Sequence, residues 1–502
     1  MEKAMSQTSN MHVVGESDGR ILPTKGPNSE GQPKGEGLEG RQPTKENTSP
    51  TAAARTQSRT TASFGREGVR EAAHKDKKVR FTALLHHVTA PLLLNSYYEL
   101  KKQAAPGVDG VTWQQYGTGL MERINDLHDR VQRGAYRAQP SKRAYIPKEE
   151  GRQRPLGIAS LEDKIVQQAL VTVLNEIYEQ DFKGFSYGFR PTRSAHDALD
   201  ALTVGLTRRK VNWVLDADIR GFFDNVDHEW MLKFLQHRIA DRRVLRLVSK
   251  WLKAGVSEEG TWSETKKGTP QGAVISPLLA NIYLHYVLDL WAHRWREKHA
   301  WGDVILTRYA DDFVMGFQHR AEAERFLAEL QERLRKFGLE LHSEKTRLIE
   351  FGRYAEENRK RRGEGKPETF NFLGFTHICG RTRAQGWFTV KRKTIAKRLR
   401  TKLREVREQL RHRWHEPIAQ TGAWLRSVVQ GHFNYYAVPG NCGSLATFRT
   451  EVARAWHWAL NRRSDRARMT WARFRPLIAR WLPRARILHP YPQGRFAVTH
   501  PR

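Results

Sequence analysis

The sequence is poor in cysteine, in long apolar runs and in acidic residues. Its 502 residues include two cysteines, Cys379 and Cys442, without a CxxC pair, which excludes a disulfide scaffold and a cysteine-rich zinc site. No apolar run reaches membrane-spanning length, and the N-terminus lacks the apolar core of a signal peptide. We therefore expect an intracellular protein of a reducing compartment, without a membrane partner.

Acidic residues are outnumbered by basic ones. The chain has 86 Lys and Arg against 54 Asp and Glu, a formal net charge of +32 and an isoelectric point near 10.3. The excess is uneven, since residues 391–502 hold 25 Lys and Arg against 5 Asp and Glu. This balance indicates a polyanionic partner, most commonly nucleic acid. The alternative is a soluble basic protein without such a partner.

The first 75 residues lack the apolar side chains that a core requires. They are rich in Gly, Ser, Thr, Pro, Lys and Glu, and the first aromatic residue is Phe64. We predict a disordered tail over 1–75, because too little apolar surface is available to offset the ordering entropy. The remaining length is sufficient for two to four domains. Apolar residues at helical spacing predict helices over 81–104, 113–133, 161–179 and 194–208.

Three carboxylates stand beside buried strands. In VILTRYADDFVMGF, residues 304–317, two β-prone runs flank Asp311 and Asp312, which predicts a β-hairpin with the acids at its turn. A third acid, Asp218, lies near the end of a predicted buried strand over 211–219, before a helix capped by Asp227. Adjacent acids at a turn repel each other unless a cation neutralises them, whereas a solvated turn is the ordinary alternative.

Basic and aromatic segments accompany these acids. Strands over 143–147 and 154–158 predict a hairpin whose turn, with Lys148, Arg152 and Arg154, either grips phosphates or is merely solvated. The segment GFSYGFRPTRS, 184–194, alternates aromatic and basic residues, which suits either a nucleic-acid strand or packing against a core. A Gly/Pro loop over 268–272 then leads into a helix over about 276–295.

The last third predicts a helix over 321–337, sheet strands over 339–351 and 370–375, and a long amphipathic helix over 394–414. We expect the basic face of that helix to bind nucleic acid, with solvation of an ordinary polar face as the alternative. Its candidate RNA-binding residues are Arg398, Arg400, Arg404, Arg407 and Arg411.

Three carboxylates from neighbouring strands can hold two divalent cations. One ion activates a hydroxyl and the other steadies a leaving group, and Mg²⁺ prefers such hard oxygen ligands. With the basic segments, this chemistry indicates nucleotidyl transfer on a nucleic-acid primer. A two-metal nuclease is the alternative that the acids alone leave open.

A series of motifs occurs in order along the chain: RPLGI, GFSYGFRP, Asp218 with FFDNVDH, TPQG at 269–272, YADD at 309–312, GLELHSEKT at 338–346 and FLGF at 372–375. Together they resemble the reverse transcriptase/maturase proteins encoded by bacterial group II introns, over roughly residues 85–480. The resemblance implies an α+β right-hand polymerase, with fingers and an antiparallel palm sheet, followed by a helical thumb/maturase domain.

The resemblance also implies roles for individual residues. Asp218, Asp311 and Asp312 would hold two Mg²⁺ ions, and Lys345 would protonate the pyrophosphate. The expected nucleotide contacts are the sugar gate Phe223, the packing residue Gln271, and the triphosphate-binding Lys148 and Arg154. The implied partners are group II intron RNA, an RNA template with a DNA primer, dNTPs and target DNA, in a bacterial cytoplasm.

The implied domains are an N-terminal extension with fingers over 76–210, a palm over 211–380 that includes 268–295, a thumb/maturase domain over 391–480, and a short basic tail over 481–502. The tail could be a reduced DNA-binding region. A His-Asn-His endonuclease is not expected, and His432-Phe433 replaces a Trp pair of some members.

Two other interpretations compete with this one. The first is an RNA-binding splicing cofactor without polymerase activity, and the intact acids argue against it. The second is a reverse transcriptase of another retroelement, and the basic helical module argues against it.

Overall fold

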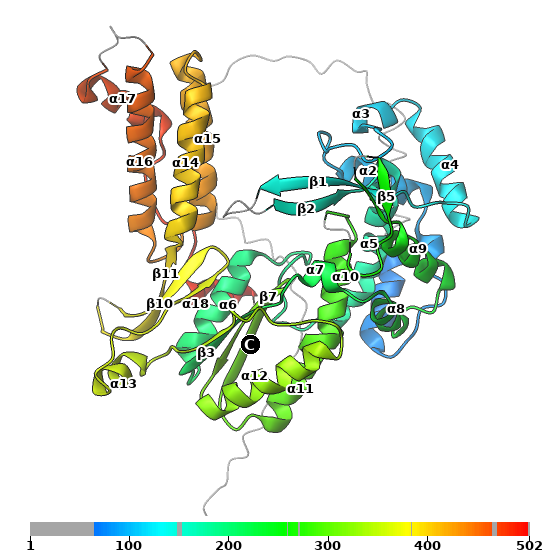
Figure 1. The fold of residues 1–502 in the computed structure, drawn as a ribbon, viewed down its shortest axis with the longest axis horizontal. Helices are drawn as coiled ribbons and strands as arrows, with labels where there is room; N and C mark the ends of the chain where they lie inside the picture. The colour runs from blue at the N-terminus through cyan, green and yellow to red at the C-terminus, as the bar shows by residue number, and fades with distance from the viewer. Residues whose placement is uncertain are drawn as a thin grey trace, which may run out of the picture. The chain divides into compact units, whose positions relative to one another are not determined.

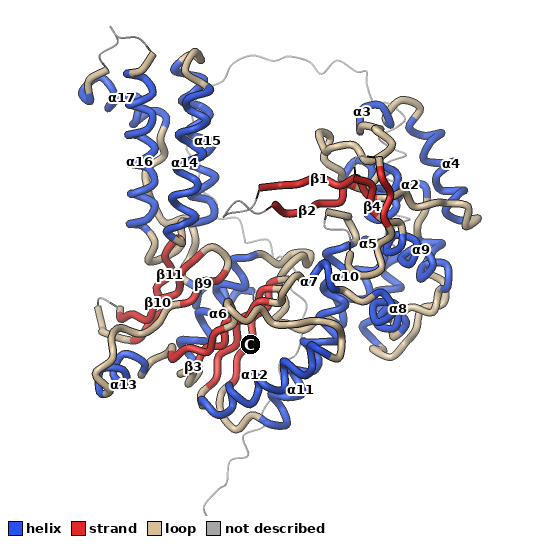
Figure 2. Tube along the Cα trace, viewed as in Figure 1, coloured by secondary structure: helices blue, strands red, loops and turns tan. Residues whose placement is uncertain are grey.

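The computed structural model describes residues 65–147, 153–258, 260–269, 272–382, 384–463 and 469–499. The chain divides into two units, and all described residues belong to the second, Ser49–Pro501. The described part mixes helices with three β-sheets, as Figure 2 shows. This agrees with the predicted α+β class.

The chain is already helical over residues 65–75, within the segment predicted to be a disordered tail. Val69 and Ala73 are buried one helical turn apart, and they join the largest core. Arg238 donates hydrogen bonds to the carbonyls of Ala73 and Asp76 at the end of this helix (3.2 and 3.0 Å). The prediction was wrong for 65–75 because a residue far along the chain satisfies the helix end. Residues 1–64 lie outside the described residues.

Most predicted helices of the N-terminal half are confirmed, although two of them are broken by turns. Thr89 and Thr112 cap the helices that start after them, by accepting hydrogen bonds from Leu92 and Gln115. The elements up to the third strand are η1 (Leu85–His87), α2 (Ala90–Glu99), α3 (Trp113–Tyr116), α4 (Leu120–Gln132), α5 (Leu161–Asp181) and α6 (Ala195–Arg208).

Two strands form the predicted basic hairpin, β1 (Ser141–Pro147) and β2 (Gln153–Ile158), which pair antiparallel. They belong to a four-stranded sheet of order β2-β1-β4-β5, with β4 (Val256–Glu258) parallel to β1 and β5 (Thr261–Ser263) at the edge. We call this the hairpin sheet. The sequence predicted its first two strands and missed the short pair β4–β5.

A four-stranded antiparallel sheet of order β6-β7-β3-β8 carries the three predicted acids, and we call it the central sheet. Its strands are β3 (Trp213–Asp218), β6 (Val304–Tyr309), β7 (Asp312–Phe317) and β8 (Arg347–Glu350). Helices lie between them in sequence: α7 (Phe222–Asn225), α8 (His228–Gln236), α9 (Arg242–Lys253), α10 (Ser276–Leu284), the π-helical turn η3 (His285–Asp289), α11 (Leu290–His299) and α12 (Arg320–Arg335).

The two faces of the central sheet pack into different cores. Leu215 and Met315 face the large core that includes Phe326 of α12, whereas Val214 and Val314 face a second core that includes Leu199 of α6. This division follows from the alternation of side chains along a strand. Figure 1 shows the strands with α12 and α6 beside them. The even-numbered face of β3, which includes Asp218, is thus the α6 side.

The strand predicted over 370–375 does not extend the central sheet. It forms β9 (Phe370–Phe372), at the edge of a separate antiparallel sheet of order β11-β10-β9, with β10 (Phe375–Arg381) and β11 (Phe388–Thr394). Leu373 and Gly374 adopt positive φ angles of 45° and 84°, which turns the chain back on itself immediately after β9. α13 (Ala355–Arg361) connects β8 to this sheet.

The C-terminal segment is helical, as predicted. The apolar stripe of the amphipathic helix α14 is confirmed, because Leu403, Val406 and Leu410 are buried in a core of their own. His432 and Phe433 also lie in this core, with the His432 ring stacked on Phe448 (3.9 Å). The helices are α14 (Ala396–His412), α15 (Ile418–Tyr436), α16 (Cys442–Asn461), α17 (Trp471–Trp481) and α18 (Pro492–Thr499).

The last described helix, α18, is anchored to α6 rather than free. Arg495 donates to the buried carboxylate of Asp200 (2.5 Å), which also pairs with Arg392 of β11 (2.9 Å). The rings of His196 and His489 stack at 4.0 Å beside this triad. One basic residue of the predicted tail is therefore used inside the fold. None of the described helices combines the length and apolar composition that a membrane crossing requires.

Candidate active site

Asp218 and Asp312 lie side by side at one end of the central sheet. Asp218 is the last residue of β3, and its register partner is Asp312, the first residue of β7. Directly paired residues of an antiparallel sheet have their side chains on the same face, about 5 Å apart at Cβ. The structure therefore brings together the two acids that the sequence placed on separate strands.

Asp311 lies in the turn between β6 and β7, and the predicted hairpin is confirmed. Tyr309 pairs with Asp312, so Ala310 and Asp311 form a two-residue turn. Ala310 has a φ of 57°, a conformation that glycine adopts far more readily than alanine. Asp311 is half-buried and Asp312 is partly exposed. The acid pair thus stands at a tight and locally strained turn.

Two aspartates at this end of the sheet have raised pKa values. The pKa of Asp312 rises to about 7, first because protein atoms exclude water from the carboxyl, and then because Asp311, Asp218 and Asp216 are close. Asp216 was missed by the sequence analysis. It lies two residues before Asp218, hence on the same face of β3, and burial raises its pKa to about 6 although Arg347 lies 3.6 Å away. The two-residue spacing was the signal that could have identified it.

Lys345 reaches the same cluster. Its ammonium group donates to Oδ2 of Asp218 at 2.5 Å. The segment that carries it is fixed to the end of β3, because the amide of His342 donates to the carbonyl of Asp218 (2.8 Å). The structure therefore brings the predicted proton donor to the predicted acids.

The donor set suits a hard divalent cation in its chemistry. Carboxylate oxygens are the ligands that Mg²⁺ prefers. The pKa of Asp312 is raised first by burial and then by the three neighbouring carboxylates, and a bound cation would relieve both effects. Among the described residues, however, no three His, Cys, Asp or Glu side chains converge closely enough to form a ready metal cage. The ammonium group of Lys345 supplies positive charge at Asp218 in this arrangement.

The predicted nucleotide contacts are only partly described. Phe223 is half-buried in α7, with its ring edge-on to Phe222 (5.3 Å), and its carbonyl accepts from the amide of Thr269 (2.8 Å). This bond holds the loop that precedes α10 against the residue predicted as the sugar gate. Gln271 and Lys148 lie outside the described residues, and of Arg154 only the backbone is described, in β2 opposite Ile146.

The aromatic-basic segment 184–194 packs largely into the core. Ser186 and Tyr187 are buried, and the buried Arg190 pairs with Glu179 at 2.8 Å. Phe189 differs, because it is 55% exposed and its ring lies 6.4 Å from that of Tyr309, the first residue of YADD. Of the two alternatives, packing is therefore confirmed for Ser186, Tyr187 and Arg190, whereas Phe189, Pro191, Thr192 and Ser194 are exposed.

The predicted RNA-binding arginines of α14 are at the surface. All five are exposed, opposite the buried stripe of Leu403, Val406 and Leu410. Arg407 pairs with Glu451 of α16 (3.2 Å), so part of its charge is already balanced. The five residues are Arg398, Arg400, Arg404, Arg407 and Arg411.

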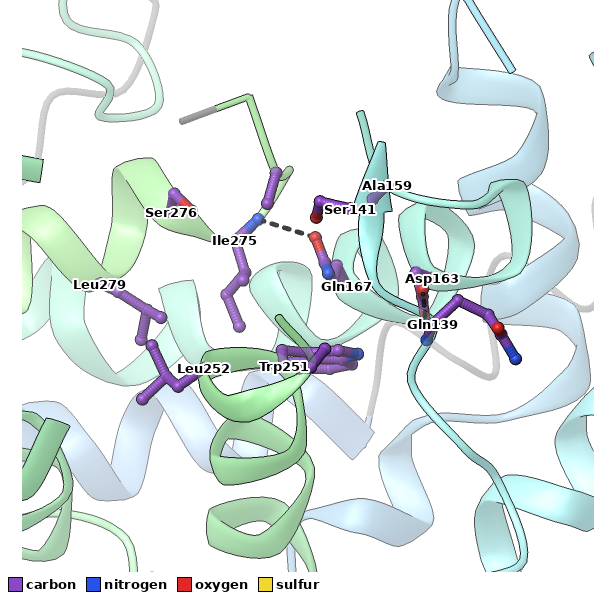
Figure 3. A pocket seen from close by; sticks show the side chains of 12 residues that line it. Gln139, Ser141, Ala159, Asp163, Gln167, Trp251, Leu252, Ile275, Ser276 and Leu279 are labelled. Atoms are coloured by element: carbon purple, nitrogen blue, oxygen red, sulfur yellow. Dashed lines mark hydrogen bonds between the residues drawn. The ribbon is translucent and has the colours of Figure 1, made fainter. Parts of the chain in front are cut away.

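An enclosed pocket at the root of the hairpin sheet is distinct from the acid cluster. Figure 3 shows it between Gln139, Gln167 and Trp251, where the amide of Ile275 donates to Gln167 (3.4 Å). Its free volume of about 10 Å³ is enough for about one water molecule. Asp163 beside it accepts hydrogen bonds from Tyr136 and Ser160. This pocket is too small for a nucleotide, and the residues that line it pack the base of the hairpin sheet.

Comparison with known proteins agrees with the geometry. Residues 146–377, which include β2 of the hairpin and the whole central sheet, match the family model described as reverse transcriptase (RNA-dependent DNA polymerase). The chain belongs to this family, and the predicted enzyme class, an RNA-directed DNA polymerase, is confirmed.

The relatives agree with the predicted resemblance to group II intron proteins. Protein YkfC of Escherichia coli is 36% identical over 276 residues, 48% of this chain and 72% of that protein. Group II intron-encoded protein LtrA of Lactococcus lactis is 32% identical over 292 residues, 55% of this chain and 48% of LtrA. A 91 kDa protein in the cob intron of Schizosaccharomyces pombe is 29% identical over 271 residues, 53% of this chain and 33% of that protein. The chain thus matches about half of LtrA.

Proposed function

We propose that the chain copies RNA into DNA by two-metal nucleotidyl transfer at Asp218, Asp311 and Asp312, and that it also binds a group II intron RNA as a maturase. The single observation that carries the proposal is the register pairing of Asp218 with Asp312, beside the turn that holds Asp311. Membership of the reverse transcriptase family supports the reaction class, and the similarity to LtrA supports the intron partner.

When bound, two Mg²⁺ ions would activate the primer 3′-hydroxyl and stabilise the leaving pyrophosphate. The three aspartates would hold them, and Asp312, whose pKa is about 7, would have to be ionised to act as a ligand. Lys345 donates to Asp218 in the structure. From there its ammonium group would turn to a pyrophosphate oxygen and give it the proton that the leaving group needs, which leaves a neutral amine on Lys345.

The nucleotide would lie between α7 and the hairpin sheet. Phe223 would exclude a 2′-hydroxyl, Gln271 would pack on the incoming nucleotide, and Lys148 and Arg154 would bind the triphosphate. The loop before α10 supports this arrangement from both sides: Thr269 bonds to Phe223, and a Cβ placed on Gly272 would lie 2.9 Å from the carbonyl of Gly157 in β2.

In domain terms, we propose fingers and an N-terminal extension over 76–210, a palm over 211–380, and a thumb/maturase domain over 391–480. The antiparallel central sheet and the helical C-terminal core support these assignments. In sequence, the last two strands, β10 and β11, lie across the boundary between the proposed palm and the proposed thumb. The proposed partners are intron RNA, an RNA template with a DNA primer, dNTPs and, for retrohoming, target DNA.

The double substitution Asp311→Ala with Asp312→Ala tests the reaction. It should abolish Mg²⁺-dependent extension of a DNA primer on an RNA template, because two of the three proposed ligands are lost, while RNA binding persists. A matched control is Glu356→Ala with Glu357→Ala, a neighbouring pair of exposed acids in α13. Primer extension by the double aspartate variant would refute the metal assignment.

Replacing Phe223 by Val tests the sugar gate. The smaller side chain should admit ribonucleotides, so that the ratio of kcat/KM for dGTP to that for GTP falls by about 10- to 100-fold. Trp230→Phe in α8 is a control for a changed aromatic side chain, since Trp230 packs on Phe234 and Phe337. Unchanged discrimination in Phe223→Val would remove Phe223 from the nucleotide site.

A further inference from the structure

A buried arginine lies directly behind the catalytic turn. Arg308 of β6 is fully buried, and all five of its guanidinium N–H groups are used. Asp289 accepts two of them (2.7 and 2.6 Å), and the carbonyl of Ala310, in the turn itself, accepts a third (2.9 Å). The last two go to Asn281 (3.0 Å) and Ser186 (2.6 Å).

Arg308 acts from the side of the sheet that the carboxylates do not occupy. Asp218, Asp312 and Tyr309 form one row of register partners, whereas Arg308 pairs with Phe313 in the next row. Side chains of successive residues point to opposite faces. The negative charge of Asp289 is therefore bound to Arg308 behind the sheet, and it does not compete with the acids in front for a cation.

Three unusual local features meet at this arginine: a π-helical turn, a positive φ angle at an alanine and a close backbone contact at a glycine. Asp289 is the last residue of the π-helical turn η3, a rare conformation that interrupts the helix from Ser276 to His299. Ala310 holds a positive φ of 57°. A side chain at Gly188 would approach the amide nitrogen of Ala310 to 2.3 Å, and the Gly188 carbonyl accepts from Asn281 (2.7 Å). Strained conformations persist where the surroundings over-determine them.

We propose that Arg308 is a positioning residue for the reaction: with Asp289 of the π-turn, it holds the Ala310 carbonyl and thereby fixes the orientation of Asp311. The Ala310 carbonyl and the Asp311 amide share one planar peptide group, so holding the former fixes the direction in which the chain enters Asp311. The segment 184–191 completes the support, because Phe185 and Tyr187 bond to the backbone of Arg308 (2.9 Å each). This inference rests on the proposed function of Asp311.

Arg308→Lys is the first test. Lysine keeps the positive charge but has three donors in place of five, so it cannot replace all the bonds that Arg308 makes to Asp289, Ala310, Asn281 and Ser186. We expect kcat for primer extension to fall about 100-fold, with the KM for dNTP within about threefold. We also expect the affinity of the protein for Mn²⁺, measured by electron paramagnetic resonance without substrate, to fall about 10- to 100-fold.

Gly188→Ala is the second test, and it keeps the buried ion pair intact. The added methyl group displaces the Ala310 peptide, so it should reproduce the losses in kcat and Mn²⁺ affinity. The matched control is Arg238→Lys. Arg238 is equally buried and pairs with Asp181 (3.0 Å), but it binds the helix over 65–75 instead of the turn. This control should lower the melting temperature while Mn²⁺ affinity and kcat stay within about threefold of wild type.

If Arg308→Lys and Gly188→Ala lose stability but keep wild-type Mn²⁺ affinity and kcat, the cluster serves only the core and the inference is overturned. Failure of Arg308→Lys to fold leaves Gly188→Ala to decide between the same two outcomes. A wild-type protein that synthesises no cDNA would refute the proposed function instead. In that case the Mn²⁺ affinities of the variants would still decide whether the cluster positions Asp311.

Discussion

Replacing Asp312 by Asn should stabilise the metal-free protein at alkaline pH. The folded-state pKa of Asp312 is about 7, far above the ordinary value for an aspartate, because burial and three neighbouring carboxylates disfavour its charge. Between about pH 4 and pH 7 the folded state therefore binds a proton that the unfolded state has released. Stability falls as pH rises through this window, and asparagine, which has no charge to lose, removes that fall.

The magnitude follows from the shift. About three pKa units correspond to at most about 4 kcal/mol. Asp312 is partly exposed, however, and solvent screening reduces this to about 1–2 kcal/mol. Asp312→Asn should thus be about 1–2 kcal/mol more stable than wild type at pH 8 and nearly equal to it at pH 4.

Urea unfolding of both proteins in chelator, from pH 4 to pH 8, measures this difference. Glu324→Gln, an exposed acid of α12 that pairs with Arg320, is the control and should show no such pH-dependent gain. Excess Mg²⁺ at pH 8 should stabilise wild type more than Asp312→Asn, since the cation binds the ionised carboxylate. A difference between wild type and Asp312→Asn that does not change with pH would refute the raised pKa of Asp312.

Two further predictions concern charges outside the acid cluster. Replacing the exposed Arg398, Arg400 and Arg404 by Gln should weaken RNA binding. Filter binding should show that the slope of log K against log salt concentration falls by up to about 2–3. An unchanged slope would show that these arginines are solvated and do not contact RNA. Replacing Asp200 by Ala should destabilise the protein by about 3–5 kcal/mol, because Arg392 and Arg495 would lose their common buried partner. Asp197→Ala is the control, because it removes a half-buried capping carboxylate at the start of the same helix without leaving a buried arginine unpaired. Equal urea midpoints for both variants would contradict the second prediction.

The acids of the site could be predicted because each depends on local pattern. Asp311 and Asp312 lie between two β-prone runs, and Asp218 ends another, so strand pairing alone brings them to one edge. Lys345 came from a motif resemblance, and the structure places it at Asp218. Asp216 was accessible by the same period-two rule but was overlooked, because it sits inside a strand that was interpreted as wholly buried.

Other elements could not be predicted, since distant residues stabilise them. The helix over 65–75 depends on Arg238 for its last carbonyls. In β11, the alternate residues Val390, Arg392 and Thr394 are buried. The strand could not be recognised from its sequence, because one of these buried positions holds an arginine instead of an apolar residue. Arg392 is tolerated there because Asp200, 192 residues earlier, neutralises it.

Buried arginines also change how the net charge should be interpreted. Arg238, Arg308 and Arg392 are almost completely inaccessible, and each is paired with an aspartate from another element. These three arginines and their aspartates cancel in the formal charge of +32, so the excess that a polyanion can meet comes from other residues. The surface potential available for RNA therefore depends on exposed residues such as those of α14. A buried arginine and its aspartate are neutral together. Removing Asp289 or Asp200 would therefore leave a buried arginine with an unbalanced charge, which destabilises the fold and does not strengthen RNA binding.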